Sequence, residues 1–372
     1  MSLFRLRGKL DSSKKLLLGV IGLVLFLIFW WILAELSSVQ KPVGYTPSEM
    51  PSSINADAAT LATIDSLERV DSIRFANATS FEKIYPSIPP PHHVLKAFPS
   101  LYHDDELLPN TLRSIWLNLQ GYFWALMIAL PIGFLIGLLP IFRGLFAGQI
   151  DAMRYLPLTA LVGLFTTWFG IDDGMKIAFL AFGIIVYILP VVVQRIDEVK
   201  DVYLKTVFTL GATDWQTIKT VYIPSVMSRM IDDIRVITAI SWTYIIIAEL
   251  LNRQGGIGSL IYIKSRQGQV AKVFAMLLVI VLIGFIQDRL FVFLDKKLFP
   301  HKYYKQNISG IAESKMGIFT ILFLVALGLF IIALIPSMTS TIHLAMLVAV
   351  LAGIIMIIFG EFKLFKSNKQ HA

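Results

Sequence analysis

Cysteine is absent from this sequence, and charged residues are scarce. Without Cys, the 372-residue chain can form no disulfide bond, no thiolate metal site and no cysteine nucleophile. Charged residues make up only 16% of the chain, against about 25% in ordinary soluble domains. A large soluble protein could not solvate so apolar a surface, so the composition indicates a protein that lies in a membrane.

A phosphate-binding loop of the Gly-x4-Gly-Lys-Ser/Thr type is also missing. The backbone amides of that loop cradle nucleotide phosphates, so the chain cannot hydrolyse ATP in that way. We therefore expect the chain itself to bind no cofactor. A metal site is not expected either, because His92 and His93 are adjacent residues that cannot easily converge on one ion.

Long apolar runs dominate what the sequence does contain. Hydrophobic residues make up 56% of the chain, its mean hydropathy is +0.71, and the runs are long enough to cross a bilayer. The first run ends in Trp30-Trp31 and is longer than the apolar core of a signal peptide, so we predict an uncleaved anchor. In all, eight spans are predicted, at residues 16–36, 114–139, 150–170, 175–194, 235–251, 271–290, 317–335 and 342–360.

The net charge of +8 comes mostly from Lys and Arg at the ends of these runs, which argues against nucleic-acid binding. Basic residues favour the cytoplasmic side of a membrane. Most of the 33 Lys and Arg residues lie on that side if both termini are cytoplasmic, with residues 37–112 outside and residues 195–235 inside. We therefore predict an all-α, multi-pass membrane protein with its N- and C-termini in the cytoplasm.

The cytoplasmic stretch 195–235 is too polar to span the membrane and too long for a simple turn. Gly211 fits the position just after a helix end, where a left-handed conformation costs glycine little. Thr213 and Gln216 then have the spacing of a capping box, and Asp214 adds negative charge to the first turn of a new helix. The sequence therefore predicts a stiff helical knob at the membrane surface.

A proline is expected to close the second helix of this knob. Nine residues separate Gly211 from the segment Val221-Tyr222-Ile223-Pro224. This spacing resembles the G-x9-I-x-L-P half of the coupling-loop motif of binding-protein-dependent ABC permeases. Five other pieces are similar to segments of the nitrate, taurine, alkanesulfonate and bicarbonate permeases: Pro86-Ser87-Ile88-Pro89, Arg154-Tyr155-Leu156-Pro157, Trp168-Phe169-Gly170-Ile171, Ala248-Glu249 and Gly255-Gly256-Ile257-Gly258.

This resemblance covers about residues 86–297 and implies a six-helix importer permease core within residues 113–298. The anchor in residues 1–36 is then followed by an external insertion in residues 37–112. A cytoplasmic linker and two additional spans occupy residues 299–372. The leading Glu-Ala-Ala of the family motif falls on Lys205-Thr206-Val207 here, which is a departure from the family pattern.

The resemblance also implies partners in a bacterial inner membrane. It implies a pair of permease subunits, expected to be identical, a pair of ATPase subunits that hold ATP and Mg²⁺, and an external solute-binding protein. The surrounding lipid is a further partner. The residues expected to contact the ATPase are Leu210, Gly211, Ala212, Thr213, Asp214, Trp215, Gln216 and Pro224.

Five residues are candidates for the solute pathway. Glu249 is an ionisable group near the outer end of the fifth span. It either lines an external vestibule or gate, or it reaches interfacial water or pairs with Arg253 one turn on. Thr238 and Ser241 either offer hydroxyls to a solute or join packed helices by hydrogen bonds. Trp168 and Trp242 are either solute contacts or interfacial anchors.

Two external segments are candidates for docking. Asp172 and Asp173 form a tight turn that either contacts the solute-binding protein or is simply solvated. The segment after the fifth span carries four basic residues and no acidic one: Arg253, Lys264, Arg266 and Lys272. These charges either attract an anionic solute or an acidic docking face, or snorkel to the lipid headgroups.

The leading hypothesis is a permease subunit, not an enzyme, that imports a small anion such as a sulfonate, nitrate or bicarbonate. An ion-gradient-driven secondary transporter is an alternative, but it should show paired half-repeats and carboxylates near the membrane midplane. A membrane scaffold or assembly protein that uses residues 37–112 for external interactions is another. It would not need the helical knob.

Overall fold

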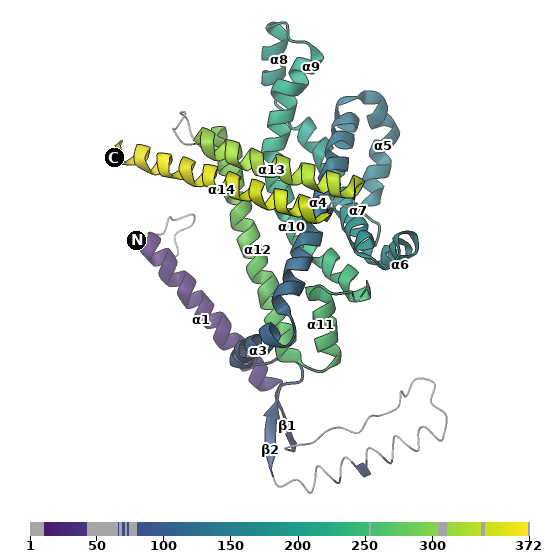
Figure 1. The fold of residues 1–372 in the computed structure, drawn as a ribbon, viewed down its shortest axis with the longest axis vertical. Helices are drawn as coiled ribbons and strands as arrows, with labels where there is room; N and C mark the ends of the chain where they lie inside the picture. Colours follow the sequence, from purple (N-terminus) through teal and green to yellow (C-terminus); the bar gives the residue numbers. More distant parts are fainter. Residues whose placement is uncertain are drawn as a thin grey trace. The chain divides into compact units, whose positions relative to one another are not determined.

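The computed structural model describes residues 11–42, 80–252, 254–303, 311–335 and 339–370, with a few isolated positions between 66 and 73. These residues are almost entirely helical, as the apolar runs predict (Figure 1). The chain divides into two compact units. One contains Met1–Glu106 and Ile261–Leu278, and the other contains Leu107–Leu260 and Val279–Ala372.

The first unit joins the N-terminal anchor to a small hairpin and a short helix. Its elements are α1 (Ser12–Leu36), β1 (Val39–Pro42), β2 (Phe81–Ile84) and α3 (Pro91–His103), with the adjoining parts of α11 (Ile257–Arg266) and α12 (Val270–Leu298). The strands are antiparallel, with Val39 opposite Ile84. The indole of Trp30 donates to the carbonyl of Pro89 (3.1 Å), and Glu35 pairs with Lys83, so α1 is fastened to the segment that precedes α3.

The second unit is a bundle built around a buried central helix. Its elements in chain order are α4 (Leu107–Leu138), α5 (Pro140–Met153), α6 (Leu158–Phe169), α7 (Asp173–Asp197), α8 (Asp201–Thr209), α9 (Asp214–Thr217), the π-helical turn η1 (Ile218–Tyr222), α10 (Ile223–Asn252), the remaining parts of α11 and α12, the 3-10 turn η2 (Pro300–Lys302), α13 (Ile311–Leu334) and α14 (Thr339–Gln370). Helix α7 packs along α4 and α10 and buries Phe179, Leu180, Ile184 and Ile188.

Within the described residues, seven helices are long and apolar enough to cross a membrane, one fewer than the eight spans predicted. The predicted span 150–170 is wrong as a single helix, because the end of α5 and the 12-residue α6 share it. Pro157 separates them: it has no amide hydrogen and disfavours a helical conformation at Leu156. The placement of both termini in the cytoplasm therefore stays a prediction, and it requires α5 and α6 to cross together.

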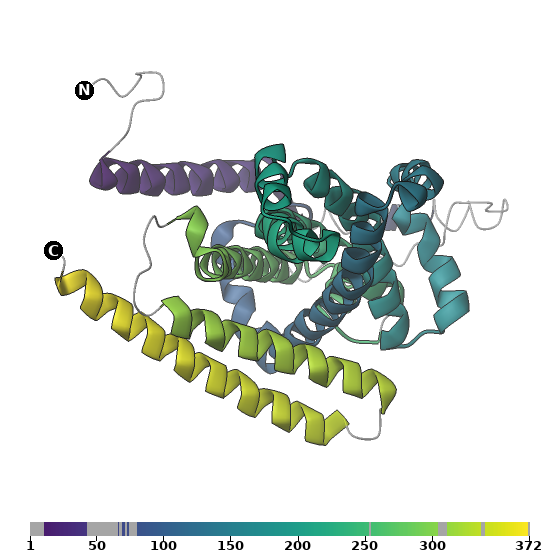
Figure 2. The same ribbon diagram turned by 90° about the horizontal axis from the view of Figure 1, so that it is seen from above.

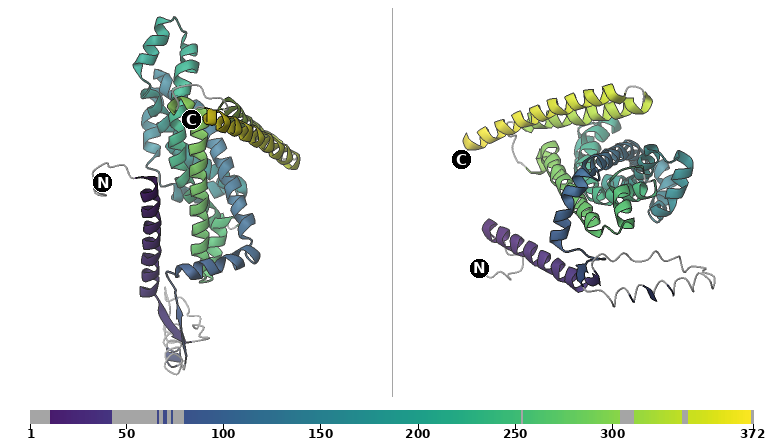
Figure 3. Two further views of the ribbon diagram at one scale, coloured as in Figure 1. Left: turned by 90° about the vertical axis from the view of Figure 1, so that its left-hand side faces the viewer. Right: turned by 60° about the horizontal axis from the view of Figure 1, so that its bottom comes forward.

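Helices α13 and α14 form a tight hairpin that runs side by side in every view (Figure 2, Figure 3). A methyl group added at Gly353 would lie 2.2 Å from Ile321 and 2.9 Å from the carbonyl oxygen of Gly317, so the two backbones meet at the glycines. Lys363 pairs with Glu313 at one end of the hairpin (2.5 Å). The other end packs on α4 through a cluster of Leu329, Ile342 and Met346 with Trp116 and Phe123.

The hairpin provides a first test of this packing. Gly353→Leu should separate α13 from α14, because a side chain has no space at the crossing, and overpacking of this kind costs about 1–3 kcal/mol. The chain has no Cys, so the double variant Glu313→Cys with Lys363→Cys carries only the two introduced thiols. The fraction of the protein that forms the disulfide between them measures how close α13 and α14 remain. The yield should fall with Gly353→Leu and stay high with Ala352→Leu, which changes an exposed neighbour.

Candidate functional site

The predicted helical knob is present and projects from one end of its unit as α8 and α9 (Figure 1). Gly211 has φ +75° and follows the end of α8, as predicted. Its amide donates to the carbonyl of Phe208 (3.0 Å), and the amide of Ala212 donates to that of Val207 (3.1 Å). These paired bonds form a Schellman motif, which satisfies carbonyls at the end of α8 and reverses the chain.

A capping box starts the second helix of the knob, as predicted. The amide of Gln216 donates to Thr213 Oγ1 (3.3 Å), and the amide of Thr213 donates to Gln216 Oε1 (2.8 Å). Asp214 lies in the first turn, where its charge complements the helix dipole. Both ends of the turn are therefore held by local hydrogen bonds, and the knob is stiff without help from the rest of the protein.

Large apolar side chains at the tip of the knob face solvent. Leu210 is 80% exposed and Trp215 is 68% exposed. Phe208 and Val202 are also exposed on α8. Apolar side chains grouped on an otherwise polar segment mark a surface that another protein covers.

The prediction that Pro224 ends the second helix is wrong. The helical run continues without interruption from Asp214 to Leu251, a length of 38 residues, and Pro224 lies in its interior, at the start of α10. The preceding turn, η1, is π-helical, so its hydrogen bonds reach one residue further than those of an α-helix. The wider turn lies directly before the proline, whose ring would clash with the preceding turn of a regular α-helix.

Continuity makes α9, η1 and α10 a single rod. At 1.5 Å per residue it is roughly 57 Å long, enough to cross a bilayer. The tip of the knob lies at one end of the rod, and Glu249 lies near the other. A displacement applied to the knob is therefore passed along α10 by an unbroken helical backbone.

Salt bridges fasten this rod to the end of α7. The guanidinium of Arg195 donates to both carboxylate oxygens of Asp233 (2.7 Å each) and to Glu198 (2.6 Å). Arg229 also donates to Glu198 (2.8 Å). The Arg195 guanidinium lowers the pKa of Glu198 below its ordinary value, so the network stays charged at neutral pH. Sequence reasoning missed it, because Arg195 and Asp233 are 38 residues apart.

The other end of α10 carries Glu249, which is completely buried. Its carboxylate accepts hydrogen bonds from Ser114 Oγ (2.6 Å) and from the amide of Gly258 (2.9 Å). Ser114 Oγ in turn accepts from the amide of Ile257 (2.9 Å), and Asn110 Oδ1 accepts from the amide of Gly256 (2.8 Å). Glu249 therefore binds the first turn of α11 and joins it to α4 and α10, rather than facing an open vestibule.

The glycine-rich turn Gly255-Gly256-Ile257-Gly258 owes its composition to this carboxylate. Gly256 has φ +99°, and a methyl group there would lie 2.2 Å from Glu249 Oε1. A methyl group at Gly258 would lie 2.8 Å from the carbonyl oxygen of Ile246. The turn wraps around Glu249 so closely that side chains have no space, which is the physical reason for the glycines.

The hydroxyls predicted for the pathway lie between α4 and α10. Ser241 Oγ contacts Asn118 Oδ1 (3.2 Å) and donates to the carbonyl of Thr238 (2.8 Å), while Thr238 Oγ1 donates to the carbonyl of Ile234 (2.8 Å). Nearby, Asn118 Nδ2 and the hydroxyl of Tyr122 are buried without a hydrogen-bond partner among the described residues. The cluster is therefore polar and incompletely satisfied within the described residues.

The tryptophans predicted for the pathway have different environments. Trp242 is buried, and its indole donates to Gln287 on α12 (2.7 Å). Trp168 is 65% exposed on α6 and packs on Phe165, with 5.6 Å between ring centroids. The structure therefore does not bring the two together with Ser241 and Glu249 into one cavity.

The predicted docking residues are largely engaged within the protein. Asp172 is the N-cap residue of α7, and Asp173 pairs with Arg113 on α4 and with Lys176 (3.0 Å each). Lys176 is itself fully buried, a feature that sequence reasoning missed. These contacts hold α4 and α7 together.

The basic external segment is partly neutralised within the first unit. Lys264 and Lys272 both pair with Asp105 (2.5 Å each). Burial tends to raise the pKa of Asp105, but the two ammonium groups lower it below its ordinary value. Arg266 is exposed, and Arg253 lies outside the described residues. Fewer free positive charges therefore face an incoming anion than the sequence alone suggested.

Comparison with known proteins gives this arrangement a family. Residues 129–300 match the family described as binding-protein-dependent transport system inner membrane component. The match contains α6 to α10, and therefore the knob and Glu249, and it ends before α13.

The names of related proteins agree with this match. The chain is 29% identical over 210 residues to a protein of Methanocaldococcus jannaschii named as an ABC transporter permease (55% of this chain, 78% of that protein). It is 25% identical over 218 residues to the taurine transport system permease protein TauC of Escherichia coli (57% and 79%). It is 27% identical over 214 residues to a Bacillus subtilis protein named as the aliphatic sulfonates transport permease SsuC (57% and 76%). Residues 129–300 of this chain therefore match the binding-protein-dependent transport family of membrane components, and the chain is similar to proteins named as ABC-transporter permeases.

Proposed function

We propose that this chain is the membrane-spanning subunit of an ATP-driven importer whose solute is a sulfonate or a similar small anion. The observation that carries the proposal is the stiff knob with exposed Leu210 and Trp215, at the end of a helix that continues through the membrane. In this proposal the knob inserts into a groove of a separate ATPase subunit, and an external binding protein delivers the solute. A second copy of the chain completes the pathway.

The mechanism follows from stiffness. Closure of the ATPase pair on ATP displaces the knob, and a floppy loop would absorb that displacement. The Schellman turn and the capping box keep the tip of the knob rigid, and the salt bridges of Arg195 keep its base rigid, so the displacement is not lost within the knob. The motion therefore reaches α10 and changes its contact with α4, where Thr238, Ser241 and Asn118 meet.

At the far end of α10, the hydrogen bonds of Glu249 carry the same motion into α11. Because Glu249 accepts from Ser114 on α4 and from Gly258 at the start of α11, these three helices move together or the bonds break. We propose that this coupling opens and closes the external end of the pathway. Glu249 then acts on helix position and does not bind the solute.

The ATPase contact has a direct test. Leu210→Asp with Trp215→Asp should abolish retention of an ATPase subunit when the tagged chain is purified from its own membranes, because both apolar contacts are replaced by charge. Mass spectrometry of the purified complex measures this. Phe81→Asp is the matched control, since Phe81 is exposed on β2, in the segment predicted to be external. Equal retention by both variants would contradict the proposed contact.

The solute class has a separate test. The relatives named for taurine and aliphatic sulfonates suggest a sulfonate, which carries one fixed negative charge at every physiological pH. Cells that express the complete transporter should take up radiolabelled taurine, and unlabelled nitrate or bicarbonate should compete poorly. Stronger competition by nitrate or bicarbonate would reassign the solute. Uptake that persists after ATP depletion but collapses with the ion gradient would favour a secondary transporter.

A further inference from the structure

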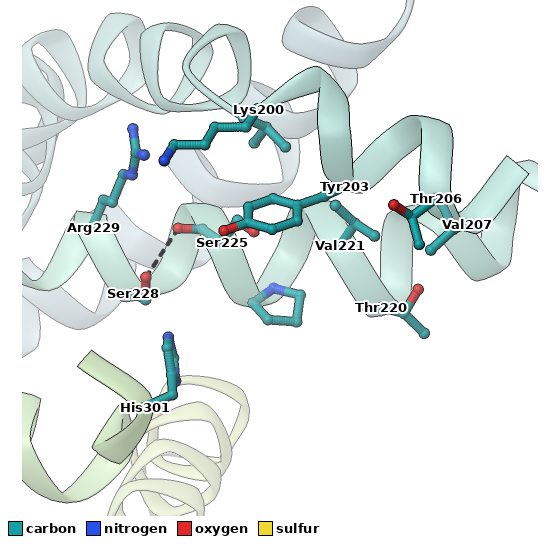
Figure 4. A pocket seen from close by; sticks show the side chains of 12 residues that line it. Lys200, Tyr203, Thr206, Val207, Thr220, Val221, Ser225, Ser228, Arg229 and His301 are labelled. Carbon is teal, nitrogen blue, oxygen red and sulfur yellow. Dashed lines mark hydrogen bonds between the residues drawn. The ribbon is translucent and has the colours of Figure 1, made fainter. Parts of the chain in front are cut away.

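A pocket of about 430 Å³ lies at the base of the knob, between α8 and the start of α10, with His301 of η2 on its opposite wall (Figure 4). It lies within the second unit. Of its lining residues only Pro224 is among those expected to contact the ATPase, and none is a candidate for the solute pathway. Its volume is that of an ordinary small-ligand site. The walls combine polar groups with the apolar side chains of Val207, Val221 and Pro224.

The charge of the pocket is entirely positive. Lys200, Arg229 and His301 line it from three different elements, and the twelve lining residues include no Asp or Glu. Lys200 and Arg229 point their cationic ends toward the same end of the pocket (Figure 4). Glu198 pairs with Arg229 from outside the lining (2.8 Å), so the Lys200 ammonium and the remaining guanidinium donors of Arg229 are the cationic groups available to an anion.

Several of these donors have no partner among the described residues. The ammonium group of Lys200 forms no hydrogen bond or ion pair there, and neither do the hydroxyls of Tyr203 and Ser225. Arg229 gives one nitrogen, Nη1, to Glu198 (2.8 Å), which leaves its other donors available. The pocket therefore presents an ammonium, a guanidinium and two hydroxyls to one ligand.

We propose that this pocket binds an oxyanion of the phosphate or sulfonate type, either free or as part of a larger ester. Lys200 and Arg229 neutralise its charge, and Tyr203 and Ser225 donate hydrogen bonds to its oxygens. The apolar wall accommodates an organic substituent. A bound anion would bridge α8 to α10 and so fix the angle of the knob, which makes the pocket a regulatory site.

Binding is measured on the full chain, purified in a maltoside detergent without phosphate, with inorganic phosphate as the probe. The phosphorus NMR line of phosphate should broaden with added protein, at constant ionic strength maintained with chloride. Lys200→Gln should weaken the binding about tenfold, because one charge-assisted contact is lost. Tyr203→Phe should weaken it less, since only a neutral donor is removed.

Lys205→Gln is the matched control, because Lys205 is an exposed residue of α8, the helix that Lys200 precedes, and does not line the pocket. Its binding should equal that of the unchanged protein. If Lys200→Gln lowers the yield of folded protein, His301→Gln tests the opposite wall. Broadening that is the same in the unchanged protein, Lys200→Gln and His301→Gln would overturn the proposal.

Two sources of the anion are distinguished by competition. A phosphatidylglycerol added to the micelles should displace phosphate if the natural ligand is a lipid headgroup, whereas phosphatidylcholine should not. Displacement by taurine or sulfate, with no effect of either lipid, identifies a free anion. No ATPase is present in these measurements, so their failure would leave the proposed importer function unaffected.

Discussion

Glu249→Ala is expected to lower the free energy of unfolding by about 3 kcal/mol and to abolish transport. A hydrogen bond contributes about 1 kcal/mol net, and the Glu249 carboxyl group accepts two, from Ser114 and from Gly258. The substitution also leaves the Gly258 amide buried without an acceptor. Because α4, α10 and α11 meet at this group, both stability and the coupling of the helices depend on it.

Thermal unfolding of the purified protein in detergent measures the loss. Glu249→Gln should be intermediate, since it keeps the shape and one acceptor oxygen. Ser114→Ala should cost less, and in combination with Glu249→Ala it should add little, because both remove the same contact. Glu82→Ala changes an exposed Glu on β2 and should leave the midpoint unchanged. An unchanged midpoint for Glu249→Ala would refute the structural role of this carboxylate.

Gly211→Ala is expected to reduce uptake and ATPase binding about tenfold while the membrane helices remain folded. Gly211 has φ +75°, and a left-handed conformation costs a residue with a Cβ about 1–2 kcal/mol. That penalty lowers the population of the correctly formed turn by about tenfold. No atom lies within 4 Å of the added methyl group, so the effect arises from the backbone and not from packing.

The measurements are solute uptake in cells and retention of the ATPase on the purified chain. Gly211→Asn should retain more function than Gly211→Ala, because Asn tolerates the left-handed region better. Gly144→Ala is the control, since Gly144 lies in α5, also has open space around it and needs no special conformation. If Gly211→Ala and Gly144→Ala transport equally well, the Schellman turn is not needed for coupling.

The sequence predicted the knob correctly because its structure depends on neighbours in the chain. The amide of Gly211 donates to the carbonyl three residues before it, the amide of Ala212 donates to the carbonyl five residues before it, and Thr213 bonds to Gln216. At Pro224 the expectation that proline ends a helix was wrong. The π-helical turn before Pro224 also depends on neighbours in the chain, but the residues there do not distinguish such a turn from an ordinary helix end.

Glu249 illustrates what could not be predicted. The sequence marked it as an ionisable group within an apolar span and left two environments open. Its partner Ser114 is 135 residues away, and the glycines that surround it were noted only as a family resemblance. Likewise, Asp105 neutralises Lys272 from a distance of 167 residues, so the external charge could not be judged from its own segment.

The sequence by itself determined the helical class, the membrane location of the apolar runs and the shape of the helical knob. Hydropathy, capping residues and a glycine after a helix end act over a few residues, so they are visible in the order of the chain. Only the tertiary structure decided that Glu249 caps α11 and that a basic pocket lies beneath the knob. Those features depend on which distant segments pack together, because burial and hydrogen-bond partners are properties of the packed helices and not of any one of them.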